Sequence, residues 1–421
     1  MGSIRHCIFA FVNSNGKKVL YISYDGMTDT LGQSQVIPYL QGLAALGFCI
    51  TILSAEKKEK MAAEGKPVGK MLDESGIMWE HISFSSAFSV LSKAYDRSKL
   101  LSKAVALQKA NKYSIIHCRS YVAAEAGLEL KNIFGCKLLF DMRGFWVDER
   151  VEGKIWNLKN PAYKLAYDKY KRIETKLIGK ADHIICLTHN AEERLVSEWS
   201  VEVDRISVIP CAADLRLFHP LDEAKRILAR KKLGIAEDTF LLGYLGSFGT
   251  WYMLEEMLKF FVILRNKKKR AKFLFLSPGK AEDVLVLAEK LGIRESDLIV
   301  KFSSRNEIPN VFGSVDAGVF FIRPTPSKKA SSPVKLGEML AMGIPVICNS
   351  GIGDTDALFE RNNIGWLLRE FTKEQTDRIV DAICNQEHPA SSTCRGVAER
   401  DFDNRKSILD YAGIYNKLTG E

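Results

Sequence analysis

With 421 residues, of which 46% are hydrophobic and 26% charged, the chain has the composition of an ordered globular protein, which excludes a disordered or fibrous one. The length exceeds what one hydrophobic core usually supports, so two domains are expected. The formal net charge is +9, and most of the surplus lies within residues 93–180. A basic segment of this kind suits contact with anionic lipid headgroups, a phosphorylated acceptor or nucleic acid. The alternative is an ordinary solvated helix surface. No RNA-binding signature or zinc finger favours nucleic acid.

The nine cysteines are scattered, without the short paired spacings of a zinc site. They indicate buried free thiols in a reducing cytoplasm. The apolar stretch Cys7–Val12 is too short to cross a membrane and lacks a small-residue cleavage site, so no export or transmembrane segment is predicted. We therefore expect a cytoplasmic protein, and we treat residues 1–17 as an N-terminal extension.

Short runs of Val, Ile, Leu and Phe alternate with helical periodicity along the whole chain, which is the pattern of parallel sheets covered by helices. The first series predicts strands at Lys18–Ser23, Cys49–Ser54, Trp79–Phe84, Ser114–Cys118, Lys137–Phe140, His183–Leu187 and Ile206–Ile209. The second predicts strands at Leu241–Leu245, Phe273–Leu276, Leu298–Phe302, Gly318–Ile322, Pro345–Asn349 and Gly365–Leu368. The fold class is therefore α/β, with two doubly wound, Rossmann-like domains at 18–210 and 211–395.

The first of two candidate ligand loops in the N-terminal domain is Tyr24–Gln35, which follows the first strand and opens a helix. Doubly wound sheets present their ligand loops at this place. Its candidate residues are Asp25, Gly26, Gly32 and Gln33. Because Asp, Gly and Thr also form ordinary turns, a plain turn remains the alternative.

The second candidate loop, Phe140–Arg150, follows another strand and contains Arg143 and Asp148. An arginine can stabilise developing phosphate charge but is a poor general base, and the alternative for Arg143 is a structural salt bridge. Arg119, after the strand that ends at Cys118, is a weaker candidate.

Two helices carry further predictions. After Pro161, tyrosines and aliphatic residues share one face, which is expected to pack on the first domain, while lysines lie largely elsewhere and suggest contact with an anionic membrane as a hypothesis. Apolar residues between Val397 and Leu418 approximate one stripe, which predicts a single final helix within the C-terminal segment 396–421.

In the second domain, the segment Gly243–Tyr252 joins the first strand to a helix and offers Gly246, Ser247 and Gly249 as a loop that lets the backbone approach a phosphate. Glycine at such a turn is also common for packing alone.

The most informative segment is Ser331–Ile347, which predicts a helix and then a buried strand. Ser332 suits the N-cap, Pro333 the first helical position and Gly343 the end of the helix. With Val334 and Lys335 in the first turn and Arg323 in the basic loop before it, the helix N-terminus is expected to hold a diphosphate.

Glu338 lies one turn beyond Lys335, and it is expected either to accept hydrogen bonds from ribose hydroxyls or to pair with that lysine. The segment Ser331–Ile347 resembles the corresponding motif of retaining glycosyltransferase family 4, in the branch that builds bacterial surface polysaccharides. The resemblance implies the GT-B fold, with an N-terminal acceptor domain and a C-terminal nucleotide-sugar domain facing across a cleft, and with the C-terminal helix crossing back. It makes the N-domain candidates acceptor-side residues: Asp25, Gly26, Gly32, Gln33, Arg119 and Asp148. Glu338 matches the family's ribose-binding glutamate.

Three departures from the family pattern concern the donor sugar and its charge. Ala330 stands where the family has a glutamate that contacts the sugar, and Tyr244 and Gly249 stand where many members have an arginine and a lysine. Lys335 or Arg323 is expected to supply the charge instead. Arg143 matches the position of a histidine that faces the reacting sugar in many members.

The resemblance implies transfer of a sugar, with retention at the anomeric carbon, from a UDP- or GDP-linked donor to a saccharide or lipid-linked acceptor. Peripheral contact with the inner face of the membrane is a hypothesis that rests on the charge pattern alone. No cofactor or metal is expected, although Asp354-Thr355-Asp356 matches a metal-binding Asp-x-Asp pattern. The alternatives are a sugar-nucleotide epimerase and a catalytically silent binding protein.

Overall fold

The computed structural model describes residues 17–85 and 90–420. Cys7 and nearly all of the predicted N-terminal extension lie outside the described residues. The described part of the chain divides into two compact units. The first contains the described residues up to Asp141, Lys180–His183 and the described residues from Ile408 onward, and the second contains Met142–Gly179 and Ile184–Ser407.

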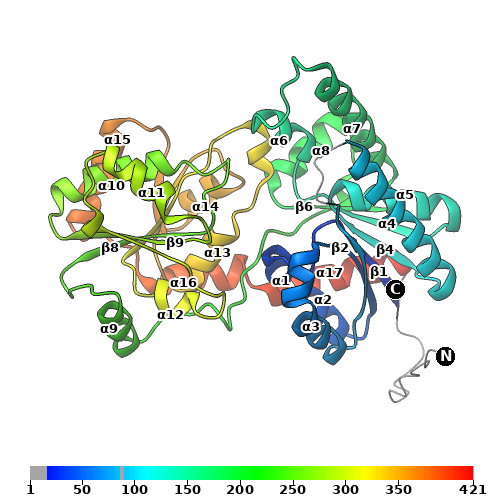
Figure 1. The fold of residues 1–421 in the computed structure, drawn as a ribbon, viewed down its shortest axis with the longest axis horizontal. Coiled ribbons are helices and arrows are strands. Elements are labelled where there is room, and N and C mark those ends of the chain that lie inside the picture. The colour runs from blue at the N-terminus through cyan, green and yellow to red at the C-terminus, as the bar shows by residue number, and fades with distance from the viewer. Residues whose placement is uncertain (1–16, 86–89, 421) are drawn as a thin grey trace. The chain divides into compact units, whose positions relative to one another are not determined.

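Two parallel sheets form the framework (Figure 1). The first has the order β3-β2-β1-β4-β5-β6-β7, with β1 (Lys18–Ser23), β2 (Cys49–Glu56), β3 (Met78–Ser83), β4 (Ile115–Arg119), β5 (Lys137–Asp141), β6 (His183–Cys186) and β7 (Ile206–Val208). The second has the order β10-β9-β8-β11-β12-β13, with β8 (Phe240–Leu245), β9 (Ala271–Leu276), β10 (Leu298–Lys301), β11 (Ala317–Phe320), β12 (Val346–Asn349) and β13 (Gly365–Leu368).

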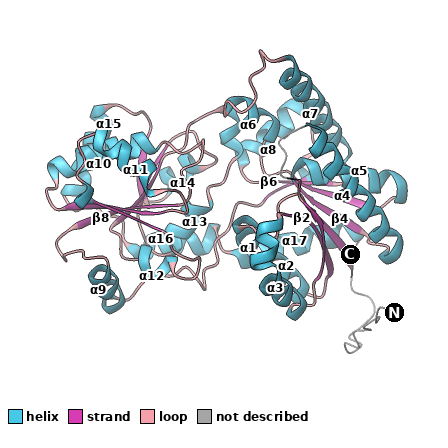
Figure 2. Ribbon diagram, viewed as in Figure 1, coloured by secondary structure: helices cyan, strands magenta, loops and turns pink. Residues whose placement is uncertain are grey.

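Helices cover both faces of each sheet (Figure 2). Those before β8 are α1 (Thr30–Gln35), α2 (Ile37–Ala45), α3 (Lys58–Glu74), α4 (Val90–Asn111), α5 (Ser120–Phe134), α6 (Trp146–Glu152), α7 (Pro161–Lys180), α8 (His189–Trp199), η1 (Val203–Arg205) and α9 (Glu223–Lys232). The others are α10 (Leu254–Lys267), α11 (Ala281–Lys290), η2 (Glu295–Asp297), α12 (Ile308–Phe312), η3 (Pro326–Ala330), α13 (Val334–Ala341), α14 (Thr355–Arg361), α15 (Lys373–Cys384), α16 (Ser391–Asp401) and α17 (Asn404–Thr419).

The strand order reverses beside the first strand of each sheet, between β1 and β4 and between β8 and β11. Strands such as β8 and β11 are buried along their whole length, which explains their continuous apolar sequence. Because the carboxyl ends of parallel strands diverge where the order reverses, the loops after them are the natural ligand loops. The predicted α/β fold with two Rossmann-like sheets is confirmed.

The thirteen predicted strands are all present, with ends that differ by at most two residues. The single predicted final helix is wrong, because the chain forms α16 and α17 with a break at Phe402 and Asp403. The backbone there pairs with Ala213, whose N–H donates to the Phe402 carbonyl oxygen at 2.8 Å. The residues of α17 from Ile408 onward belong to the first unit, where Tyr415 packs on Phe48 and donates to or accepts from His117 at 2.7 Å.

Candidate functional site

Helix α13 begins one residue later than the sequence predicts. Pro333, with an extended backbone, occupies the N-cap position, and Val334 is the first helical residue. Ser332 is therefore not the cap: its hydroxyl accepts a hydrogen bond from the Cys211 backbone N–H at 3.1 Å instead. The helix ends at Ala341 as expected, just before Gly343 in the left-handed region.

Lys335 points from the first turn of α13 into a slot between the rings of Tyr244 and Tyr252. Its Nζ lies 4.2 Å from the centre of the Tyr244 ring and 3.6 Å from that of Tyr252, and it donates to the Tyr244 hydroxyl at 3.1 Å. Burial lowers the pKa of Lys335 well below its usual value, and the charge of Glu338 opposes this only in part. Because burying a charge is costly unless an opposite charge pairs with it, an anion bound beside the Lys335 amine would be stabilised.

Tyr244, which stands where many members of the resembled family have an arginine, contacts both Lys335 and the loop after β8. Its hydroxyl donates to the Ser247 carbonyl oxygen and accepts from Lys335, so one phenol links helix α13 to the glycine loop after β8. Burial raises the pKa of Tyr244, which keeps this hydroxyl protonated. The cation of the site thus comes from α13, and β8 supplies the phenol that orients it.

Gly246 brings the glycine loop close to that cation. Its φ of +122° is unfavourable for other residues, and a Cβ atom there would lie 2.9 Å from the Lys335 amine. Ser247 and Gly249 are exposed in the same loop, and Gly249 accepts a backbone hydrogen bond from Tyr252 at 3.1 Å. The structure therefore brings the predicted glycine loop and Lys335 together.

Glu338 is buried on the same helix, and its ion-pair partner is not Lys335. Arg305, in the loop between β10 and α12, donates to Glu338 Oε1 at 2.9 Å. Burial raises the pKa of Glu338, while the charges of Arg305 and Lys335 act against this. The sequence analysis missed Arg305, although it follows a predicted strand at the carboxyl end of the sheet, which is the signal that selected the other loops.

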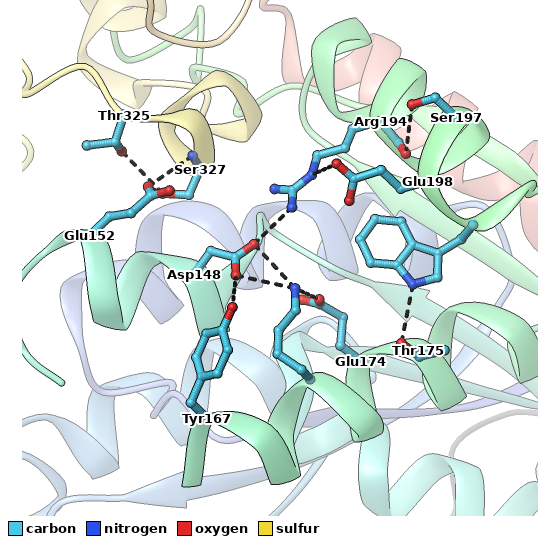
Figure 3. A network of polar contacts seen from close by, with 12 residues as sticks. Asp148, Glu152, Tyr167, Glu174, Thr175, Arg194, Ser197, Glu198, Thr325 and Ser327 are labelled. Carbon is cyan, nitrogen blue, oxygen red and sulfur yellow. Dashed lines mark hydrogen bonds and ion pairs between the residues drawn. The ribbon is translucent and has the colours of Figure 1, made fainter. Parts of the chain in front are cut away.

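The segment before α13 is tied to helices α6 and α8, all within the second unit. Ser327 donates through its backbone N–H and its hydroxyl to Glu152 (Figure 3), and Lys328 pairs with Glu149 at 3.0 Å. Ala330, where the family has a sugar-binding glutamate, is buried. Arg323 is exposed, and its backbone N–H donates to the Trp251 carbonyl oxygen.

Arg143 adopts a φ of 61° and donates to Cys211 Sγ at 3.1 Å. Because the Cys211 N–H in turn donates to Ser332, two consecutive contacts connect Arg143 to the residue that precedes the cap of α13. This places the arginine predicted from the second loop close to the predicted donor segment.

Asp148, predicted as an acceptor-side residue, is the centre of a polar network between α6, α7 and α8 (Figure 3). Its carboxylate accepts from Tyr167 at 3.2 Å and pairs with Lys171 at 3.3 Å and with Arg194 at 3.1 Å. Lys171 also pairs with the fully buried Glu174. These contacts show that the face of α7 that carries Tyr167 and Lys171 packs on α6 and α8.

The other acceptor-side candidates belong to the first unit. Arg119 is buried at the end of β4, with its guanidinium 3.6 Å from both Asp25 and Asp141. Gly26 and Gly32 have packing roles, since a Cβ on Gly26 would lie 2.7 Å from Glu56 and one on Gly32 would lie 2.3 Å from the Gly26 carbonyl oxygen.

The buried carboxylate of Glu56, which the sequence analysis missed, holds this loop. It accepts from the backbone N–H groups of Met27 and Thr28, at 2.6 and 3.2 Å, and from the Thr28 hydroxyl at 2.5 Å. Gln33 donates to the Thr28 carbonyl oxygen at 3.3 Å. These contacts tie the loop to Glu56 at the end of β2, and Asp25 is its half-exposed charge.

Both carboxylates of the Asp-x-Asp sequence have partners within the chain. Asp354 accepts from the backbone N–H of His189 at 2.8 Å and from Asn190, and Asp356 accepts from the Gly351 N–H at 2.8 Å. These bonds order the start of α8 and the turn after β12.

Comparison with known proteins shows the family of this chain. A family model described as Glycosyltransferase Family 4 matches residues 35–217, and one described as Glycosyl transferases group 1 matches residues 225–395. The chain belongs to glycosyltransferase family 4, with the GT-B fold. It is therefore a glycosyltransferase.

Three similar proteins cover nearly the full chain. The UDP-Gal:alpha-D-GlcNAc-diphosphoundecaprenol alpha-1,3-galactosyltransferase of Escherichia coli is 22% identical over 90% of this chain and 95% of its own. A sucrose-phosphate synthase from Thermosynechococcus elongatus superimposes with a TM-score of 0.73 at 14% identity, covering 96% of this chain and 99% of its own. The Anabaena HepE protein, in complex with UDP-glucose, gives 0.67 at 15% identity, with 94% and 99% covered.

Proposed function

We propose that this family 4 glycosyltransferase transfers a sugar from a UDP-linked donor to a saccharide or lipid-linked acceptor, with retention of the anomeric configuration, in the synthesis of a bacterial surface polysaccharide. The observation that carries the proposal is the buried amine of Lys335 between the N-terminus of α13 and Gly246, with the Glu338 carboxylate one turn further. The names of the Escherichia coli and Anabaena proteins favour UDP over GDP.

In this proposal the donor diphosphate lies at the start of α13. The helix dipole and the Lys335 cation stabilise the negative charge that grows on the diphosphate as the bond to the anomeric carbon breaks. The acceptor hydroxyl forms the new bond on the face that the diphosphate leaves, and its proton passes to the leaving phosphate oxygen. Arg143, connected to Ser332 through Cys211, is positioned to add positive charge beside this site.

Thermal shift with UDP, GDP and their sugars tests the donor class. Stabilisation by the UDP series supports the proposal, whereas stabilisation by GDP compounds alone would show that UDP is not the nucleotide of the donor.

Calorimetry of Glu338→Ala tests the ribose contact. We expect the free energy of UDP binding to weaken by about 1.5 to 3 kcal/mol, as for the loss of hydrogen bonds to a charged group. Unchanged affinity for UDP would remove that role. NMR of the product then reports retention or inversion.

A catalytically silent binding protein is the second candidate, and Ala330 favours it, because a buried methyl group replaces the carboxylate that contacts the sugar in the family. The two candidates differ in turnover. Binding of UDP-sugars without transfer to any lipid-linked or saccharide acceptor would support the silent protein.

Peripheral contact with a membrane forms part of the proposal. No helix among the described residues is long and apolar enough to cross a bilayer. At the start of α7, however, Leu165 and Tyr163 are 67% and 40% exposed beside the exposed Lys159, Lys164 and Lys169. Apolar side chains among lysines suit an anionic lipid surface. Flotation with anionic vesicles should fall for Leu165→Gln, and flotation that does not depend on anionic lipid would remove this contact.

A further inference from the structure

The ion pair between Arg305 and Glu338 joins two segments that are far apart in the sequence. Glu338 is 7% exposed at its side chain and Arg305 is 25% exposed, so the pair lies at the edge of the buried region. Arg305 Nη1 contacts only Oε1 of the carboxylate. Within the described part of the chain, no donor reaches Oε2.

The position of Arg305 is fixed from two further directions. Its guanidinium lies 5.0 Å from the centre of the ring of Phe218, which is fully buried. Its loop is closed by Ser304, whose backbone N–H and hydroxyl donate to Glu307 at 3.2 and 2.8 Å. An arginine held by a ring and by a closed loop loses little conformational freedom when it pairs with a carboxylate.

The charges around Glu338 leave Arg305 as its direct counter-ion. Lys335 lies one turn earlier on α13 and acts through the Coulomb interaction alone. Arg395 of α16, the helix that packs on α13, donates to the carbonyl oxygens of Phe218 and Ala341 and pairs with Glu399. Arg305 is thus the group whose removal leaves the carboxylate without a hydrogen-bonded partner in the described residues.

We propose that Arg305 is a positioning residue for nucleoside recognition: it holds Oε1 of Glu338 and thereby presents Oε2 to the ribose hydroxyls of the donor. This inference rests on the proposed ribose contact of Glu338. An ionised carboxylate is a pure acceptor, whereas a protonated one must donate through one oxygen. Burial raises the pKa of Glu338 and Arg305 opposes the rise, so without Arg305 the carboxyl becomes protonated at a higher pH.

The test is the affinity of the full chain for UDP, measured by calorimetry between pH 5.5 and 8.5, for Arg305→Gln and for the unchanged chain. The ratio of the two affinities cancels the titration of the nucleotide phosphates. We expect Arg305→Gln to bind about tenfold more weakly at pH 8, a loss of about 1.4 kcal/mol, and to weaken further as the pH falls. Arg378→Gln, which removes an exposed arginine from an ion pair with Glu374, is the matched control.

Two further measurements keep the test decisive if Arg305→Gln folds poorly. Arg305→Lys retains a cation and should give an intermediate pH profile. In a Glu338→Gln background, Arg305→Gln should change UDP affinity less than about twofold, because the two side chains act as one unit. The unchanged chain should also prefer UDP to 2′-deoxy-UDP by a ratio that shrinks in Arg305→Gln.

If Arg305→Gln binds UDP as tightly as the unchanged chain at every pH, the inference is overturned. It is also overturned if Arg305→Gln weakens UDP binding as much in the Glu338→Gln background as it does alone. Failure of the proposed function gives a different result. If Glu338→Ala itself leaves UDP affinity unchanged, the ribose contact is wrong; if Glu338→Ala weakens binding and Arg305→Gln does not, only the role of Arg305 is wrong.

Discussion

Replacement of Lys335 by methionine should change stability and donor affinity in opposite directions. The amine is buried, its one hydrogen-bond acceptor among the described residues is the neutral Tyr244 hydroxyl, and its pKa is lowered well below the usual value. The unfolded chain, with an ordinary lysine pKa of about 10.4, therefore binds more protons than the folded chain. Lys335 lowers the free energy of unfolding at neutral pH, and this penalty fades as the pH rises toward about 10.4.

The sizes of the two effects follow from the contacts. Burying an ammonium without a counter-ion costs several kcal/mol. The rings of Tyr244 and Tyr252 return about 2 kcal/mol for a desolvated cation. Lys335→Met should therefore stabilise the unliganded chain by about 1 to 2 kcal/mol, which raises Tm by about 2 to 4 °C per kcal/mol. The lost charged hydrogen bond to the diphosphate should weaken UDP binding by about 1.5 to 3 kcal/mol, or about 10- to 150-fold.

Thermal denaturation at pH 7 and pH 10, together with calorimetry of UDP, measures both effects. The gain in Tm should be larger at pH 7 than at pH 10. Lys232→Met, which removes an exposed lysine of α9, serves as the control and should change neither quantity. A lower Tm together with unchanged UDP affinity would refute the reasoning, because it would show that Lys335 serves the fold and does not bind the donor.

Three other substitutions test the roles of residues in the glycine loop and in helix α6. Gly246→Ala should weaken UDP binding about tenfold in calorimetry, because φ of +122° disfavours alanine and the new Cβ would displace the Lys335 amine; equal affinity would show that the loop adapts. Asp148→Asn should lower Tm by several degrees in thermal denaturation and leave the acceptor KM unchanged, whereas a raised KM at unchanged Tm would support the predicted acceptor-side role. Glu152→Ala should speed hydrogen exchange of the Ser327 N–H, and unchanged exchange would mean that other contacts hold η3.

The sequence by itself determined the two sheets and the place of the donor helix. Apolar runs of four to eight residues separated by helical periodicity specify buried parallel strands, and the Gly343 and Pro345 signals fix where α13 ends and β12 begins. Lys335 and Glu338 could be chosen because residues in the first turns of a helix have a known position relative to its dipole. These are local properties, so the chain order alone is enough to reveal them.

The tertiary structure decided which partners those residues have. The pairing of Glu338 with Arg305 spans 33 residues, and the contact of Lys335 with Tyr244 spans 91. The hydroxyl of Ser332 looked like a cap in the sequence, but the Cys211 N–H lies within reach only after the chain folds. Side-chain pairing depends on the register of strands and on helix packing, and a periodic apolar pattern fixes which face of an element is buried without fixing which residue meets it.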